Sequence, residues 1–221
     1  MTMTHEEYAL RQDIISKCLF MNDSGINQGT SGNISARYGD YMLITPSGVP
    51  YHRMEPEMLA KMPISTDYGT WEGPMKPSTE WRFHLDILKA RDDMHAVVHT
   101  HSTYCTAVAI ARKDIPAVHY MIAAFGGPVV RCAEFARFGT PELSANALEA
   151  LEGRSGCLLA NHGMIVTGEN LDKAMWRAVE LETLARQYYN TLLMGDAVVL
   201  SDEEIAGTIE AFASYGPKDE E

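Results

Sequence analysis

The run Ala96-Val97-Val98-His99-Thr100-His101 restricts the fold of this chain more than any other segment. Small and β-branched apolar residues lead directly into two histidines, a pattern typical of a buried strand. Alternate side chains of a strand point to the same face of a sheet, so His99 and His101 are expected to project together. Two such imidazoles form one edge of a metal site, although histidines at a strand end often bond only to the backbone.

Two further segments offer metal ligands in comparable settings. His162 follows the apolar run 157–160 and precedes Gly163, and Glu80 follows Ser78 and Thr79 in the first turn of a predicted helix. Zinc sites that perform chemistry use about three protein ligands and leave one position open. We therefore consider a metal site against the alternative of strand-end histidines bonded to the backbone.

Three segments rich in glycine and hydroxyl side chains are candidates for anion binding. The first covers residues 25–35, the second is Thr45-Pro46-Ser47-Gly48, and the third is the helix start at Ser78 and Thr79. Glycine permits the backbone nests that bind anions, and a helix N-terminus favours phosphate. The alternatives are a flexible turn and a simple helix cap. No Walker or Rossmann spacing accompanies these glycines.

The predicted elements favour an α/β fold. The segments 34–38 and 41–45 read as strands of a hairpin that turns at Gly39-Asp40. Helical spacing and capping residues predict helices over 4–22, 78–88, 103–112, 140–151, 171–194 and 201–215. We expect one domain over residues 1–221, with a central mixed, largely antiparallel β-sheet and helices on both faces. Residues 216–221 are expected to form a flexible tail.

Composition excludes several classes of partner. The chain has 221 residues and a net charge of −12, which argues against nucleic acid or an anionic membrane as its main partner. No apolar run approaches the roughly 20 residues that span a bilayer, and the N-terminus lacks the features of a signal peptide. The four cysteines are scattered, as in a reducing compartment. We expect a cytoplasmic protein.

Six motifs occur in a fixed order along the chain: Gly29-Thr30-Ser31-Gly32-Asn33, Ile44-Thr45-Pro46-Ser47-Gly48, Pro77-Ser78-Thr79-Glu80, His99-Thr100-His101, Phe138-Gly139-Thr140 and His162-Gly163. Together they resemble the class II aldolase/epimerase family, from about Ile14 to Tyr215. The resemblance implies a three-layer α/β/α fold and a cytoplasmic homotetramer whose active sites lie between subunits.

The resemblance also implies roles for individual residues. His99, His101 and His162 match the ligands of one Zn²⁺ per subunit, with Co²⁺ or Mn²⁺ as alternatives, and Glu80 matches an acid/base that also ligates the metal. The phosphate-binding residues are matched by Gly32, Asn33, Ser47, Gly48, Ser78 and Thr79. The remaining matches are Tyr120, which reaches the site of a neighbouring subunit, and Phe138 and Tyr215, which line the aldehyde side.

The implied activity is reversible cleavage of a phosphorylated sugar, a ketose 1-phosphate, into dihydroxyacetone phosphate and a short aldehyde. L-Fuculose 1-phosphate, 5-deoxyribulose 1-phosphate and methylthioribulose 1-phosphate are the candidate substrates. The same site type also supports sugar-phosphate 4-epimerases and methylthioribulose-1-phosphate dehydratases. A non-enzymatic, adducin-like binding module is a further alternative, which the presence of all three histidines and Glu80 disfavours.

Overall fold

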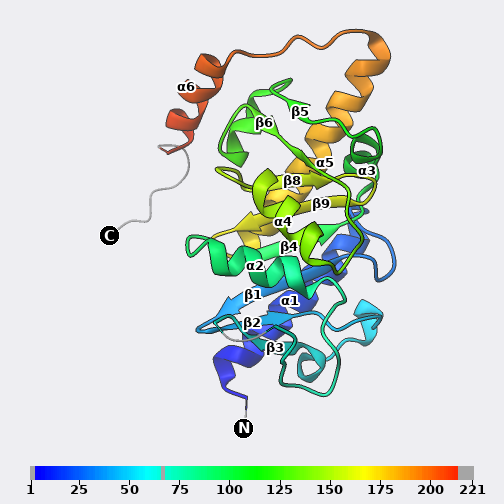
Figure 1. The fold of residues 1–221 in the computed structure, drawn as a ribbon, viewed down its shortest axis with the longest axis vertical. Helices are drawn as coiled ribbons and strands as arrows, with labels where there is room; N and C mark the ends of the chain where they lie inside the picture. The colour runs from blue at the N-terminus through cyan, green and yellow to red at the C-terminus, as the bar shows by residue number, and fades with distance from the viewer. Residues whose placement is uncertain (1–2, 66–67, 214–221) are drawn as a thin grey trace.

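A seven-stranded sheet forms the centre of the protein in a computed structural model that describes residues 3–65 and 68–213 (Figure 1). Its strand order is β3-β2-β1-β4-β9-β8-β7. The strands are β1 (Asn33–Tyr38), β2 (Tyr41–Ile44), β3 (Ala60–Pro63), β4 (Ala96–Thr100), β7 (Cys132–Ala133), β8 (Gly156–Leu159) and β9 (Gly163–Gly168). A separate two-stranded sheet pairs β5 (Ile115–Pro116) with β6 (Val129–Val130).

The large sheet is mixed but mostly antiparallel. The predicted hairpin is present, with Tyr38 opposite Tyr41 in the β1–β2 pair. Strand β4 lies in the middle, antiparallel to β1 on one side and to β9 on the other. Only the β7–β8 pair of this sheet is parallel. The histidine-bearing strand is therefore covered on both edges, as the apolar run predicted.

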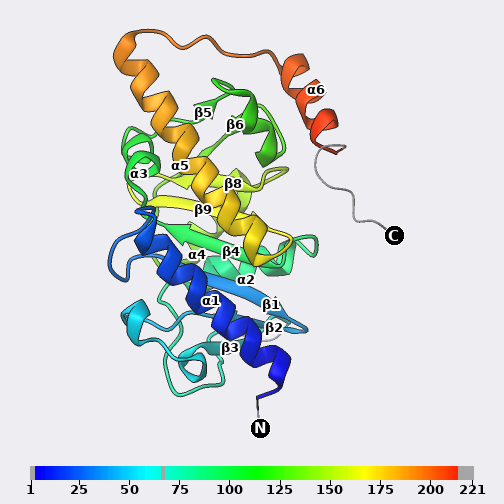
Figure 2. The same cartoon turned by 180° about the vertical axis from the view of Figure 1, so that it is seen from behind.

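Helices cover both faces of the sheet. One face packs against α1 (His5–Asp23), α3 (Thr103–Ile110) and α5 (Leu171–Met194), which lie in front in Figure 2. The other face packs against α2 (Trp81–Ala90) and α4 (Pro141–Ala150). Each face of the sheet has its own hydrophobic core, and adjacent residues of β4 point to opposite faces. Val98 belongs to the core beneath α1, α3 and α5, and Val97 belongs to the core beneath α2 and α4.

Side-chain caps begin four of the described helices where the sequence predicted a start or close to it, one of them being Ser201, which accepts from Glu204 N at the start of the last helix. Thr4 accepts from Glu7 N at α1, Thr140 accepts from Leu143 N at α4, and Asn170 accepts from Lys173 N at α5. The short 3₁₀ helices are η1 (Tyr51–Arg53), η2 (Pro56–Met58) and η3 (Tyr120–Phe125).

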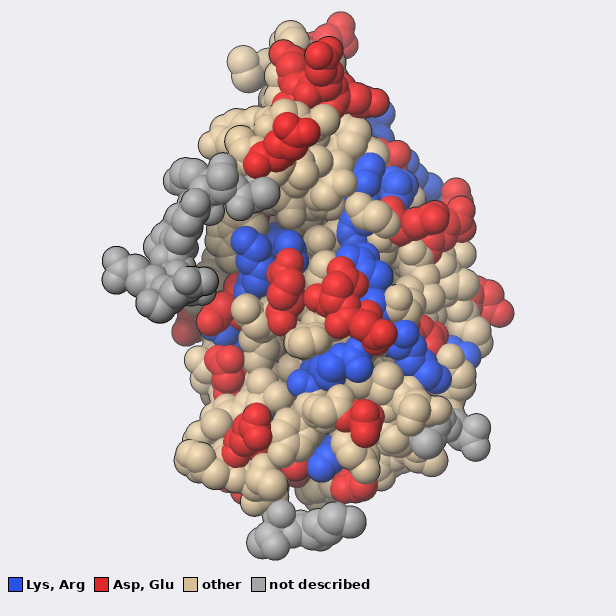
Figure 3. Space-filling view, turned by 90° about the vertical axis from the view of Figure 1, so that its left-hand side faces the viewer, with Lys and Arg blue, Asp and Glu red and all other residues tan. Residues whose placement is uncertain are grey.

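The last helix, α6 (Asp202–Ala213), follows a segment without regular structure and packs against η3 (Figure 1). The tail predicted at 216–221 lies outside the described residues. Among the described residues, no helix combines the length and the apolar character needed to cross a membrane. On the face shown in Figure 3, basic and acidic side chains are interspersed.

The predicted fold class is confirmed: a single α/β domain with a mixed central sheet and helices on both faces. One local expectation was wrong. Glu80 is the N-cap residue of α2 rather than a member of its first turn, with φ −100° and ψ 12°. The helix was predicted from residue 78 but begins at Trp81, so the Glu80 side chain leaves the chain at the end of the helix and not from its flank.

Leu181 tests how strongly α5 is anchored in the core. Its side chain is fully buried, so Leu181→Ala should lower the free energy of unfolding by about 2–5 kcal/mol. Gln187→Ala, on the exposed side of the same helix, should change it by no more than about 0.5 kcal/mol. Urea unfolding at one fixed protein concentration measures both, and equal losses would contradict the assigned packing.

Candidate metal centre

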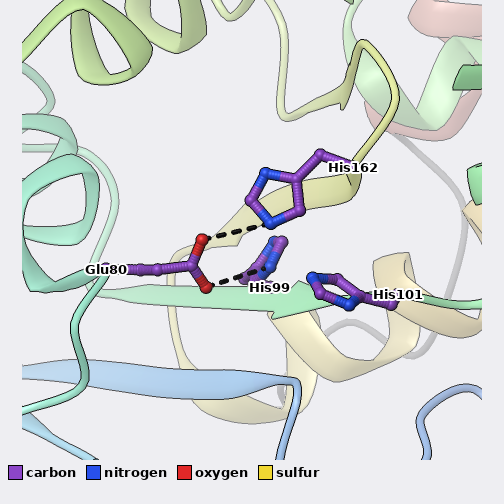
Figure 4. A group of neighbouring side chains, drawn as sticks. All are labelled: Glu80, His99, His101 and His162. Carbon is purple, nitrogen blue, oxygen red and sulfur yellow. Dashed lines mark ion pairs between the residues drawn. The ribbon is translucent and has the colours of Figure 1, made fainter. Parts of the chain in front are cut away.

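Four side chains converge on one point at the C-terminal end of the central strand β4: Glu80, His99, His101 and His162 (Figure 4). One potential ligand atom from each lies within 4.8 Å of the others. The three imidazole rings are mutually edge-on, with centroid separations of 4.8 to 4.9 Å. The histidines and the glutamate singled out in the sequence therefore form one cluster.

Three different elements deliver these side chains. His99 is the fourth residue of β4, and His101 follows immediately after the strand. His162 lies in the turn between β8 and β9, and Glu80 caps α2. Gly163 allows the turn to approach β4, because a Cβ atom there would lie 2.4 Å from the carbonyl oxygen of Thr100.

The histidine nitrogens are arranged to face the centre of the cluster. His99 is fully buried, and its Nδ1 donates to the carbonyl oxygen of Met164 at 2.8 Å, which leaves the Nε2 lone pair free. Burial, together with the nearby His99 and His162 rings, lowers the pKa of His101 to about 4. His101 is therefore neutral at pH 7, the form in which imidazole binds metals.

Glu80 is ionised in this setting. Burial alone would raise the pKa of its carboxyl, but the His99 and His162 rings hold that pKa well below its usual range. Its Oε2 lies 3.2 Å from His99 Nε2, and its Oε1 lies 3.1 Å from His162 Nε2.

The donor set fits a divalent metal ion. Glu80 Oε1, His99 Nε2 and His101 Nε2 are buried and have no hydrogen-bond partner among the described residues. Buried polar atoms without partners are costly, and a cation bound between them would satisfy all three at once. Three imidazole nitrogens and a carboxylate oxygen are typical ligands of zinc and suit cobalt or manganese as well.

A pocket of about 410 Å³ opens beside the cluster. Phe138 lies on its wall and is 59% exposed. Sequence reasoning missed several other wall residues, among them Phe135, Arg137 and Asn161. They lie in segments without periodicity, so no pattern marked them.

The residues predicted to bind phosphate lie at neighbouring positions at this end of the sheet. Gly32 immediately precedes β1, Asn33 begins it, and Ser47 and Gly48 follow β2, its hairpin partner. Ser78 N donates to the carbonyl oxygen of Thr45 at 2.9 Å, which ties the helix start to the second loop. Thr79 lines the pocket beside Glu80.

Gly32 is packed too tightly for any other residue. A Cβ atom there would lie 2.7 Å from Asn27 Oδ1 and 2.8 Å from the carbonyl oxygen of His99. The hydroxyl of Tyr51 donates to the Gly32 carbonyl oxygen at 2.5 Å. Asn27 and Tyr51, neither of which the sequence singled out, thus hold this loop against the histidine strand.

Tyr120 lies elsewhere. It begins η3, is 50% exposed, and lines a different, larger hollow of about 1110 Å³ together with Phe212 of α6. Its ring packs against those of His119 and Phe212. The structure of one chain therefore does not bring Tyr120 to the cluster. Tyr215 lies outside the described residues.

A histidine that belongs to none of the six sequence motifs lies directly behind the cluster. His84 is fully buried and contacts Asn33 and Ser35. It lies four residues after Glu80, one helical turn along the chain, and that spacing was the available signal. The sequence alone does not mark His84 as part of the site, because its partners come from β1, which only the folded chain brings near.

Comparisons with known proteins agree with this geometry. Residues 12–189 match the family model described as Class II Aldolase and Adducin N-terminal domain. The L-fuculose phosphate aldolase of Escherichia coli K12 is 48% identical over 217 residues, 98% of this chain and 100% of that protein. A 5-methylthioribulose-1-phosphate/5-deoxyribulose-1-phosphate aldolase of Rhodospirillum rubrum is 45% identical, covering 97% of this chain and 96% of that protein.

Structural comparison gives the same result. A solved L-fuculose 1-phosphate aldolase superposes with a TM-score of 0.89 at 38% identity, covering 93% of this chain and 96% of that one. The chain belongs to the class II aldolase family. It is an enzyme of the aldehyde-lyase type, and enzymes of this class depend on a metal ion.

His99→Asn tests the cluster as a metal site. Removing one ligand should weaken metal binding by at least about 100-fold, more than the loss of an outer hydrogen bond costs. Plasma mass spectrometry after dialysis should find about one divalent ion per chain in the wild type and almost none in the variant. His95→Asn, at an exposed position just before the same strand, is the matched control. Undiminished metal in a folded His99→Asn would refute the assignment.

Proposed function

We propose that this enzyme is a zinc-dependent aldolase that reversibly cleaves a deoxyketose 1-phosphate into dihydroxyacetone phosphate and a short aldehyde. The observation that carries the proposal is the convergence of three histidines and Glu80 beside a pocket. The named relatives support the substrate class, since they are aldolases of L-fuculose phosphate and of 5-deoxyribulose or methylthioribulose 1-phosphate. They do not favour the epimerase, dehydratase or adducin-like alternatives.

His99, His101 and His162 would hold the ion, with Glu80 as a further ligand. A bound zinc ion supplies Lewis-acid stabilisation of the negative charge that develops on the substrate oxygens. None of the segments that line the pocket contributes a lysine, so none of these residues offers a Schiff base as an alternative electron sink.

Glu80 would transfer the proton at carbon. In the direction of condensation its carboxylate takes a proton from the hydroxymethyl carbon of dihydroxyacetone phosphate. The electron pair left on that carbon forms the new bond to the aldehyde carbon, and the aldehyde oxygen takes up a proton. In cleavage the C3–C4 bond breaks, the C4 hydroxyl loses its proton as the aldehyde forms, and Glu80 returns a proton to C3.

The phosphate would bind between the loops that carry Gly32, Asn33, Ser47, Gly48, Ser78 and Thr79. Backbone N–H groups of such loops and the N-terminus of α2 provide donors for an anion without a basic side chain. Such an arrangement would allow a chain with a net charge of −12 to bind a phosphorylated sugar.

Tyr120 would supply the proton for the aldehyde oxygen in the site of a neighbouring subunit. Its exposure and its place in a separate hollow are compatible with that role. The proposal therefore includes a homotetramer with sites between subunits, in which Phe138 and Tyr215 line the aldehyde side. The cytoplasm, where ketose phosphates are metabolised, is the proposed location.

The direct test supplies dihydroxyacetone phosphate with a panel of short aldehydes, including L-lactaldehyde, acetaldehyde and methylthioacetaldehyde. Products should form with at least one aldehyde, disappear after treatment with a chelator and return when zinc is restored. Chromatography with mass detection identifies each ketose 1-phosphate. An enzyme that holds its metal but forms no carbon–carbon bond with any of these aldehydes would contradict the proposal.

Glu80→Gln separates the proton transfer from metal binding. The amide cannot act as a base, so solvent exchange at C3 of dihydroxyacetone phosphate should fall by about 10²–10⁴-fold. Metal content should stay unchanged, because three histidines remain. Proton NMR in deuterated water follows the exchange, and Glu149→Gln, an exposed glutamate of α4, serves as control. Wild-type exchange in Glu80→Gln would remove Glu80 from the mechanism.

A further inference from the structure

A buried chain of hydrogen bonds runs from β1 to the carboxylate of Glu80. Ser35 Oγ lies 2.8 Å from His84 Nδ1, and His84 Nε2 lies 2.5 Å from Asn33 Oδ1. The amide of Asn33 then donates from Nδ2 to Glu80 Oε2 at 2.9 Å. Ser35 and His84 are fully buried, and Asn33 and Glu80 are 4% and 5% exposed. Water therefore has little access to compete for these bonds.

The polar groups allow only one direction for this chain. An ionised Glu80 only accepts, so Asn33 must present its NH₂ group to Glu80 and its carbonyl oxygen to His84. His84 must therefore carry its proton on Nε2, and neutral Nδ1 must accept from the hydroxyl of Ser35. Every donor points towards Glu80.

The surroundings of His84 keep it neutral and fixed. Burial is the main reason that the pKa of its ring falls to about 3. The ring also stacks on Phe83 at a centroid separation of 4.7 Å. A neutral, immobile ring fixes one orientation of the Asn33 amide.

The two oxygens of Glu80 are consequently unlike. Oε2 accepts a hydrogen bond from Asn33 Nδ2, whereas Oε1 receives none from Asn33 and lies 3.1 Å from Nε2 of His162 in the cluster. A carboxylate held by one oxygen leaves the other as the better base. The chain thus selects the oxygen as well as the direction in which the carboxylate points.

We propose that His84 is a positioning residue that acts through Asn33, holds Glu80 by Oε2 and leaves Oε1 to exchange the proton with the substrate. This inference rests on the proposed function, in which Glu80 is the acid/base. Without the donor on His84, the buried carbonyl oxygen of Asn33 loses its partner, and the amide turns away from Glu80 to find another. The Glu80 carboxylate then loses the hydrogen bond that fixes its orientation, although all metal ligands remain.

Two substitutions at His84 separate positioning from packing. His84→Gln keeps a donor at the end of a side chain of similar reach, whereas His84→Met fills similar space without one. The Met variant should lower kcat for proton exchange at C3 of dihydroxyacetone phosphate by about 10–100-fold, as expected when a reacting group is misplaced. The KM should change by less than about 2-fold, and the Gln variant should recover most of kcat, because only the donor differs.

Crystal structures of the variants give a readout that does not depend on activity. The Asn33 amide should leave Glu80 Oε2 in the Met variant and keep that contact in the Gln variant, with equal metal content in both.

Ser35→Ala gives a second route should His84→Met fail to fold. Loss of the hydroxyl lets the opposite tautomer of His84 compete, so kcat should fall in the same direction by a smaller factor, about 3–10-fold.

The inference is overturned if His84→Met and His84→Gln lose kcat equally. It is also overturned if His84→Met or Ser35→Ala exchanges the C3 proton at the wild-type rate, or if KM rises while kcat stays unchanged. An unmoved Asn33–Glu80 contact in the Met variant also overturns it. Absence of exchange in the metal-loaded wild type is a different outcome, since it removes the proposed function itself. The measurements on the wild type and on the variants thus distinguish the two failures.

Discussion

The structure depends on concentrating four polar, ionisable side chains at one buried point. Glu80 and His99 are 5% and 0% exposed, a placement that is unfavourable unless their polar atoms are satisfied. The fold supplies part of that satisfaction through the carbonyl oxygen of Met164 and the amide of Asn33. The buried polar atoms that still have no hydrogen-bond partner among the described residues are placed to bind a cation. Central placement of β4, the close approach allowed by Gly163 and the position of Glu80 at the start of α2 all serve this convergence.

Much of this arrangement could be predicted from the sequence because its signals are local. The apolar run before His99, the hairpin turn at Gly39-Asp40 and the cap at Thr140 are each decided within a few residues. The bounds of α5 were predicted as Leu171–Met194, since the apolar stripe is long and a glycine follows it. The metal cluster could be predicted because its three histidines stand at or just after the ends of predicted strands.

What the sequence left out depends on contacts between distant segments. Strands of two to four residues such as β3 and β7 carry too little periodicity to detect, and their pairing partners define them. The role of His84 needs Asn33 and Ser35 from another element, so one-dimensional spacing only hinted at it. The start of α2 was predicted three residues too early, at 78 and not at Trp81, because helix ends are the least certain part of such a prediction. Tyr120 lies away from the cluster in a single chain, so the role proposed for it depends on the proposed assembly of several copies.

The origin of the four donors in separate segments has a consequence for the lifetime of the enzyme in the cell. Glu80, the two histidines His99 and His101, and His162 are far apart along the unfolded chain. An ion would therefore bind the native state in strong preference to the unfolded one. Mass action then adds the free energy of metal binding to the stability of the domain. Metal starvation would therefore reduce the amount of protein that survives proteolysis, in addition to silencing the copies that remain.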